Sequence, residues 1–104
     1  MKIAVAADTN NTDASVSMHA ARAPYYLLYD EKGKLLDVIR NPFSGVERGA
    51  APGAAELLVT QGVNTLVAGE CGGRFTELLA NHNITLVIAQ GTAANAVSNA
   101  ICKQ

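Results

Sequence analysis

The residues best suited to chemistry lie in two short stretches, GECGGR at residues 69–74 and SMHAAR at residues 17–22. In the first, Cys71 carries a thiol, and a thiolate is a strong ligand for soft metals and metal clusters. We expect a helix to begin near Gly73 or Arg74, and the helix N-terminus and the guanidinium would favour the thiolate over the thiol. The candidate cofactor-binding residues of this stretch are Glu70, Cys71, Gly72, Gly73 and Arg74.

The same cysteine has a structural interpretation that stays open at this point. Cys71 stands between a glutamate and two glycines, and small thiols are often buried as hydrophobic side chains in tight turns. The carboxylate of Glu70 also opposes the formation of a thiolate. The sequence therefore offers either a cofactor loop or a turn around a buried sulfur.

The second stretch carries His19 and Arg22 in a polar, turn-rich segment that we interpret as a long loop. A neutral imidazole can ligate metal, and an arginine fork can hold sulfide, carboxylate or phosphate groups. The alternatives are a histidine that hydrogen-bonds the loop backbone and an arginine that orders the loop through a salt bridge. We expect Met18 to pack rather than to ligate. Further along, Gly91 and Thr92 either donate backbone N–H groups to an anion or form the N-cap of a helix.

The elements that must position these residues follow from apolar runs and from Gly and Pro signals. Strands are expected at 2–7, 25–30, 34–40, 64–69 and 84–89, with a hairpin turn at Gly33. Helices are expected at 52–61, 74–82 and 91–104.

Helices between strands imply parallel crossovers, whereas the hairpin implies one antiparallel strand. We therefore predict a single α/β domain over residues 1–104, with a five-stranded mixed sheet in the order 3-2-1-4-5. Strand 2 would be antiparallel and helices would cover both faces. The C-terminal ends of strands 1, 3, 4 and 5 would then share the edge at which open α/β sheets bind ligands.

Composition excludes several classes of protein. Apolar residues make up 49% of the 104 residues, so we do not expect disorder. A net charge of -1 and 5% aromatic residues argue against nucleic-acid binding. The first residues do not have the pattern of a signal peptide, and no apolar run has the length of a membrane span. We expect a cytoplasmic protein with reduced cysteines, no membrane partner, and a monomeric or weakly dimeric state.

The ordered set of motifs resembles the dinitrogenase iron-molybdenum cofactor biosynthesis family, the NifX-like domains that also occur at the C-terminus of NifB-type proteins. It consists of MKIAVA, VSMHAARAPYYLLYD, NP, GAAELLVTQGVNTLVAG and LLANHNITLVIAQGTAANAV. The resemblance implies a ribonuclease-H-like fold. The chain departs from the family pattern at Ala20 and Ala21, where Phe-Gly is usual, and at Cys71, which stands in an apolar position.

The resemblance also implies a function that is not catalytic. Some members of the family bind or carry iron-molybdenum cofactor, its iron-sulfur precursors or a molybdenum-containing cluster, and the expected partners of this protein are then donor or acceptor proteins in cofactor assembly. On this basis His19 and Cys71 are the predicted metal ligands, and purified protein is expected to be apo because two ligands hold a cluster weakly. Two other hypotheses remain: a metal-free module that binds a small anion or a protein, and an enzyme with Cys71 as nucleophile and His19 as base.

Overall fold

A computed structural model describes residues 2–11, 13–46 and 48–102, and within these residues five strands and three helices follow one another along the chain. Each lies where an apolar run or a helical pattern predicts it. The elements are β1 (Lys2–Ala7), β2 (Tyr25–Asp30), β3 (Leu35–Arg40), α1 (Ala50–Thr60), β4 (Thr65–Ala68), α2 (Gly73–Asn81), β5 (Thr85–Ile88) and α3 (Ala93–Cys102).

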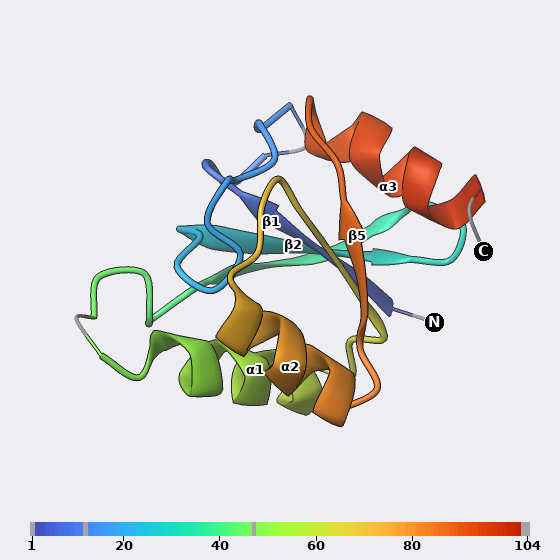
Figure 1. Cartoon of the computed structure of the whole chain (residues 1–104). Helices are drawn as coiled ribbons and strands as arrows, with labels where there is room; N and C mark the ends of the chain where they lie inside the picture. Colours follow the sequence, from blue (N-terminus) through green and yellow to red (C-terminus); the bar gives the residue numbers. More distant parts are fainter. Residues whose placement is uncertain (1, 12, 47, 103–104) are drawn as a thin grey trace.

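The sheet has the predicted order β3-β2-β1-β4-β5 (Figure 1). At its centre Val5 of β1 lies opposite Leu27 of antiparallel β2 and opposite Val67 of parallel β4. β5 continues the parallel half, and β3 pairs with β2 in antiparallel fashion. The predicted strand order and the antiparallel β2 are therefore confirmed. Four strands end at the same edge of the sheet.

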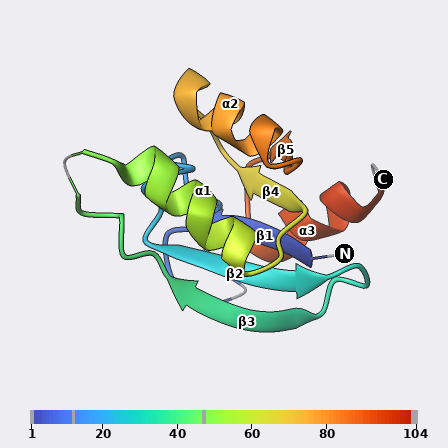
Figure 2. The ribbon, with the colours of Figure 1, turned by 90° about the horizontal axis from the view of Figure 1, so that it is seen from below.

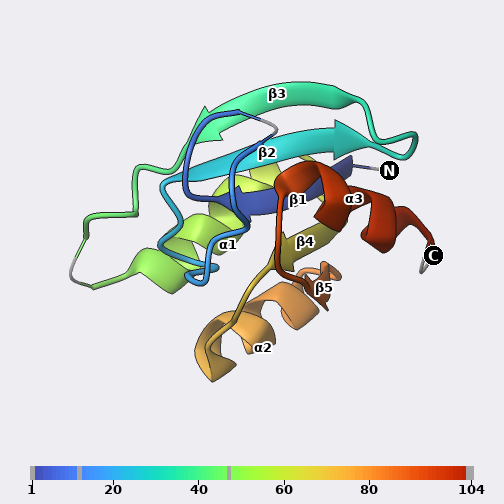
Figure 3. The same cartoon turned by 90° about the horizontal axis from the view of Figure 1, so that it is seen from above.

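Helices cover both faces of the sheet, as predicted. Figure 1 shows α1 and α2 on one side and α3 on the other, and Figures 2 and 3 show the two faces in turn. Successive residues of β1 alternate between the two layers: Ala4 faces the core beneath α1 and α2, whereas Ile3 and Val5 face the core beneath α3. Because β1 is central and covered on both sides, Ile3–Ala7 are fully buried, which explains its continuous apolar run.

Glycines in the left-handed conformation mark the ends of two elements. Gly33, with φ of 82°, closes the predicted hairpin between β2 and β3. Gly62, with φ of 74°, ends α1 where predicted. The helix begins two residues earlier than the predicted Pro52, since Gly49 at φ 78° provides the turn and Ala50 already has helical conformation.

The long loop after β1 is attached by short bridges to the edge of the sheet at which four strands end. Val16 pairs with Ala7, and Ser15 pairs with Thr92 at the start of α3. These contacts place the loop beside the end of β1 and the segment that follows β5. No helix among the described residues has the length and apolar character needed to cross a membrane.

Candidate functional site

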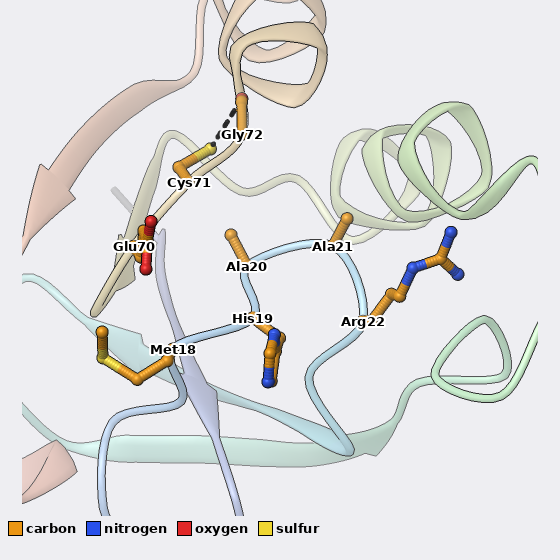
Figure 4. A pocket seen from close by; sticks show the side chains of 8 residues that line it. All are labelled: Met18, His19, Ala20, Ala21, Arg22, Glu70, Cys71 and Gly72. Atoms are coloured by element: carbon orange, nitrogen blue, oxygen red, sulfur yellow. Dashed lines mark hydrogen bonds between the residues drawn. The ribbon is translucent and has the colours of Figure 1, made fainter.

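A pocket of about 390 Å³ lies between the loop after β1 and the loop after β4 (Figure 4). Both stretches singled out in the sequence contribute to its wall, because the ends of parallel neighbours β1 and β4 lie side by side. Its lining residues are Met18, His19, Ala20, Ala21, Arg22, Glu70, Cys71 and Gly72.

Ser17 joins the two loops. Its N–H donates to the carbonyl of Ala6 at 2.7 Å, and its own carbonyl accepts the N–H of Gly69 at 2.8 Å. Ser17 thereby links the end of β1 to the residue that follows β4. Gly69 allows this close approach, because a Cβ at that position would lie 2.5 Å from Met18 Sδ and 3.1 Å from the Ser17 carbonyl oxygen. Met18 lies against Gly69 and lines the pocket, and 45% of the residue is exposed.

Cys71 is half-buried in the pocket wall and forms no disulfide within the described residues. The Thr76 hydroxyl lies 3.2 Å from its Sγ and 2.9 Å from the carbonyl oxygen of Gly72. The single hydroxyl proton can therefore be donated either to the sulfur or to the carbonyl. Gly72 is the N-cap of α2 and has no side chain, so it cannot cap the first N–H groups of this helix with a side-chain acceptor. The side chain of Cys102 lies outside the described residues.

Tyr26 lies beneath the pocket and is fully buried. Its hydroxyl donates to the carbonyl of Ala20. Burial, and to a smaller extent the nearby charge of the Cys71 thiolate, raise the pKa of the Tyr26 hydroxyl well above its ordinary value, which keeps it protonated as a donor.

Asn41 holds the rest of the same loop. Its side-chain amide donates to the carbonyls of Ala21 and Ala23, each at 2.9 Å, and only 1% of the residue is exposed. Its Oδ1 accepts the N–H of Phe43 at 3.0 Å, which fixes the orientation of the amide. Sequence reasoning missed Tyr26 and Asn41 as residues of the site, although the NP pair after β3 was a signal that an asparagine begins a turn there.

His19 and Arg22 lie on the pocket wall in different surroundings. His19 is exposed, its backbone N–H donates to Ser17 Oγ at 3.1 Å, and its ring points away from Cys71 in Figure 4. Arg22 is also exposed and donates to the carbonyl of Val46, so it orders the loop after β3. In this arrangement the imidazole and the thiol do not converge on one point, and joint ligation requires His19 to rotate.

Four of the predicted residues lie outside the pocket lining. Gly73 and Arg74 form the exposed first turn of α2. Gly91 has φ of 97° and its carbonyl accepts the N–H of Val16 at 2.9 Å. Thr92 Oγ1 accepts the N–H of Asn95 at 3.4 Å, which matches the N-cap interpretation.

The side chains on the pocket wall that could ligate or bind an ion are few and of mixed charge. Among the described residues there is no group of three or more His, Cys, Asp or Glu side chains that could hold a metal ion. The pocket instead combines one thiol, one guanidinium and one imidazole with the opposing carboxylate of Glu70. A second pocket of about 530 Å³, lined by Arg40, Asn41, Pro42, Ser44 and Gly45, contains no soft ligand.

Comparison with known proteins agrees with this fold. The apo form of the orange protein from Desulfovibrio gigas is similar, with a TM-score of 0.91 and 24% sequence identity, over 99% of this chain and 88% of that one. A putative NifB protein from Thermotoga is similar with a TM-score of 0.79 and 24% identity, over 98% and 87% of the two chains. No match was found among the curated proteins. The family model described as dinitrogenase iron-molybdenum cofactor matches residues 1–104. The chain therefore belongs to the dinitrogenase iron-molybdenum cofactor family.

Proposed function

We propose that this protein binds, carries and protects a preassembled anionic metal-sulfur cofactor, and that it does so without catalysing a reaction. The observation that supports this most directly is the pocket itself, in which the Cys71 thiol and the Arg22 side chain lie on facing loops. Membership of the family points to the same class of cargo. The cargo is the iron-molybdenum cofactor, its iron-sulfur precursor or a molybdenum-containing cluster.

Cys71 is the proposed sulfur ligand in this pocket. Its half-buried thiol is accessible to a bulky cargo, and the absence of side chains at Gly72 and Gly73 leaves open space beside it. The Thr76 hydroxyl supports the thiolate when it donates to Sγ. His19 is the proposed second ligand once its exposed ring has rotated towards the cargo.

Charged side chains around the pocket adjust the affinity for an anionic cluster. Arg22 offsets the negative charge of the cluster from one side of the pocket, and Arg74 adds positive charge from the first turn of α2. Glu70 opposes both and weakens the binding of anions. Weak, reversible binding suits a carrier, because the cofactor has to pass from a donor protein to an acceptor protein.

The experiment that tests the proposal is an anaerobic titration of the apo-protein with a reconstituted iron-sulfur cluster and with tetrathiomolybdate, followed by visible absorption and metal analysis. We expect stoichiometric uptake by the wild type and by Cys102→Ser, which is the matched control for the loss of a thiol. Cys71→Ser and His19→Ala should lose most of the uptake.

The two variants also separate the alternatives. Uptake by Cys71→Ser equal to that of the wild type would show that the ligand assignment is wrong. If the wild type took up neither cluster, the carrier function would be rejected in favour of a metal-free module that binds a small anion or a partner protein.

A further inference from the structure

The carbonyl groups of Ala20, Ala21 and Ala23 are all turned into the protein by buried donors. The Tyr26 hydroxyl donates to the first, and the side-chain amide of Asn41 donates to the other two. Both donors are almost fully shielded from solvent. Two side chains from β2 and from the end of β3 thus determine which way the peptide groups of the pocket loop face.

The consequence for the pocket follows from the planarity of the peptide bond. A trans peptide points its C=O and the following N–H in opposite directions, and the described residues contain no cis peptide. Because the carbonyl of Ala20 points to Tyr26, the N–H of Ala21 points to the opposite side, where Ala21 lines the pocket. Within residues 2–11, 13–46 and 48–102, no hydrogen bond is donated by this N–H.

We propose that Tyr26 and Asn41 are positioning residues that turn the carbonyl oxygens away from the pocket, so that the Ala21 N–H donates to a tetrahedral oxo- or thio-anion. The inference deepens the proposed function and relies on it only for the identity of the natural cargo. A carbonyl oxygen facing the pocket would repel an anion, whereas an N–H forms a charge-assisted hydrogen bond with it. The orientation of these peptide groups therefore selects for negative charge.

The backbone N–H adds a donor to a pocket whose side chains are poorly suited to bind an anion. Arg22 donates to the carbonyl of Val46, and the Glu70 carboxylate opposes an anion. A backbone N–H remains a donor at every pH at which the protein is folded. It reaches the ligand without the entropy cost of ordering a long side chain.

The test is titration of ¹⁵N-labelled apo-protein with molybdate and, anaerobically, with tetrathiomolybdate, while the amide resonance of Ala21 is followed. We expect this resonance to shift in the wild type. Tyr26→Phe retains the ring and loses only the hydroxyl that holds the Ala20 carbonyl, so it should bind either anion roughly tenfold more weakly or worse. Asn41→Leu adds no charge and removes the donor to the carbonyls of Ala21 and Ala23, so it tests the same idea if Tyr26→Phe fails to fold.

The matched control is Tyr29→Phe. Tyr29 is buried in the layer beneath α3 and its hydroxyl has no hydrogen-bond partner among the described residues, so this variant should retain the affinity of the wild type. Thermal unfolding of each variant separates a loss of affinity from a loss of fold. The readout is the shift of the Ala21 resonance that the anion induces, because a merely structural role of Tyr26 or Asn41 would change this resonance in the apo-protein and leave the anion-induced shift in place.

The outcomes distinguish this inference from the carrier function. If the wild type binds a cluster while the Ala21 resonance stays in place and both variants bind equally well, the inference is wrong and the carrier function stands. If no cluster is taken up but molybdate shifts the Ala21 resonance in the wild type and not in Tyr26→Phe, the carrier function is wrong and the inference stands. An Ala21 resonance that neither anion shifts would overturn the inference.

Discussion

Met18 lies across Gly69 so closely that its Sδ would stand 2.5 Å from a Cβ at that position. The contact brings the loop after β1 onto the end of β4, where both loops form the pocket. A side chain at residue 69 would meet the loop at the point where it crosses the sheet edge. The shape of the pocket therefore depends on a residue that contributes no side chain to it.

Gly69→Ala should destabilise the protein by about 1–2 kcal/mol, as overpacking does. The exposed Met18 side chain can turn into solvent, but the Ser17 carbonyl oxygen, at 3.1 Å from the new Cβ, belongs to the backbone and accepts a hydrogen bond from residue 69. Urea unfolding measures the effect. Gly73→Ala is the control, because a Cβ there meets no atom within 4 Å, and it should not destabilise. Equal midpoints for Gly69→Ala and the wild type would contradict the prediction.

The effect of Gly53→Ala on the free energy of unfolding should change sign when the ring of Phe43 is removed. A Cβ at Gly53 in α1 would lie 2.6 Å from Cδ1 and Cζ of the Phe43 ring, so Gly53→Ala forces the ring to move and should destabilise the protein. In a Phe43→Ala background the ring is absent, and the same change should stabilise α1 by up to about 1 kcal/mol through helix propensity. Free energies of unfolding of the four proteins test this. Destabilisation in both backgrounds would show that the ring is not the cause.

Asp30 should contribute to stability in a pH-dependent way. Its Oδ1 accepts the N–H groups of Lys34 and Lys32, each at 2.9 Å, and these bonds, the first above all, lower the pKa of the carboxyl below its ordinary value of 3.8. A lowered pKa in the folded state means that the contribution is present above pH 3.8 and is lost as the pH falls through the folded-state value. Asp30→Asn should therefore be less stable than the wild type at pH 7, with a difference that shrinks in acid. A difference that is independent of pH would contradict this.

Thr76 should control the reactivity of Cys71. Its hydroxyl lies 3.2 Å from Sγ, so Thr76→Val, which has nearly the same shape, removes a donor to the thiolate. In a Cys102→Ser background we expect the second-order rate with a thiol reagent at neutral pH to fall roughly two- to tenfold. Thr76→Ser keeps the hydroxyl and should react like the parent. If Thr76→Val reacted as fast as Thr76→Ser, the hydroxyl would be bonded only to the carbonyl of Gly72.

Much of the fold could be predicted because its signals are local. The apolar run at Lys2–Ala7 and the glycines at 33 and 62 each mark an element or its end within a few residues. The strand order follows from connection rules that need only the sequence of elements. The start of α1 lies at Ala50 rather than at the predicted Pro52, since a proline indicates a first turn without showing which residue of that turn it occupies.

The position of the pocket could be predicted in part, because it follows from the order of the strands. Once the strand order is known, the loops carrying His19 and Cys71 must meet at one edge, and the pocket contains both residues. The sequence also placed Gly91 and Thr92 at that edge but could not show that the pocket lies elsewhere along it.

The amino-acid sequence by itself determined the elements, their order in the sheet and the edge at which reactive side chains gather. Only the tertiary structure decided the direction of the His19 ring and the roles of Tyr26 and Asn41. Those roles depend on hydrogen bonds to carbonyls 6 to 20 residues away in the chain. No local pattern encodes such a bond, because its donor and acceptor meet only after the sheet has assembled.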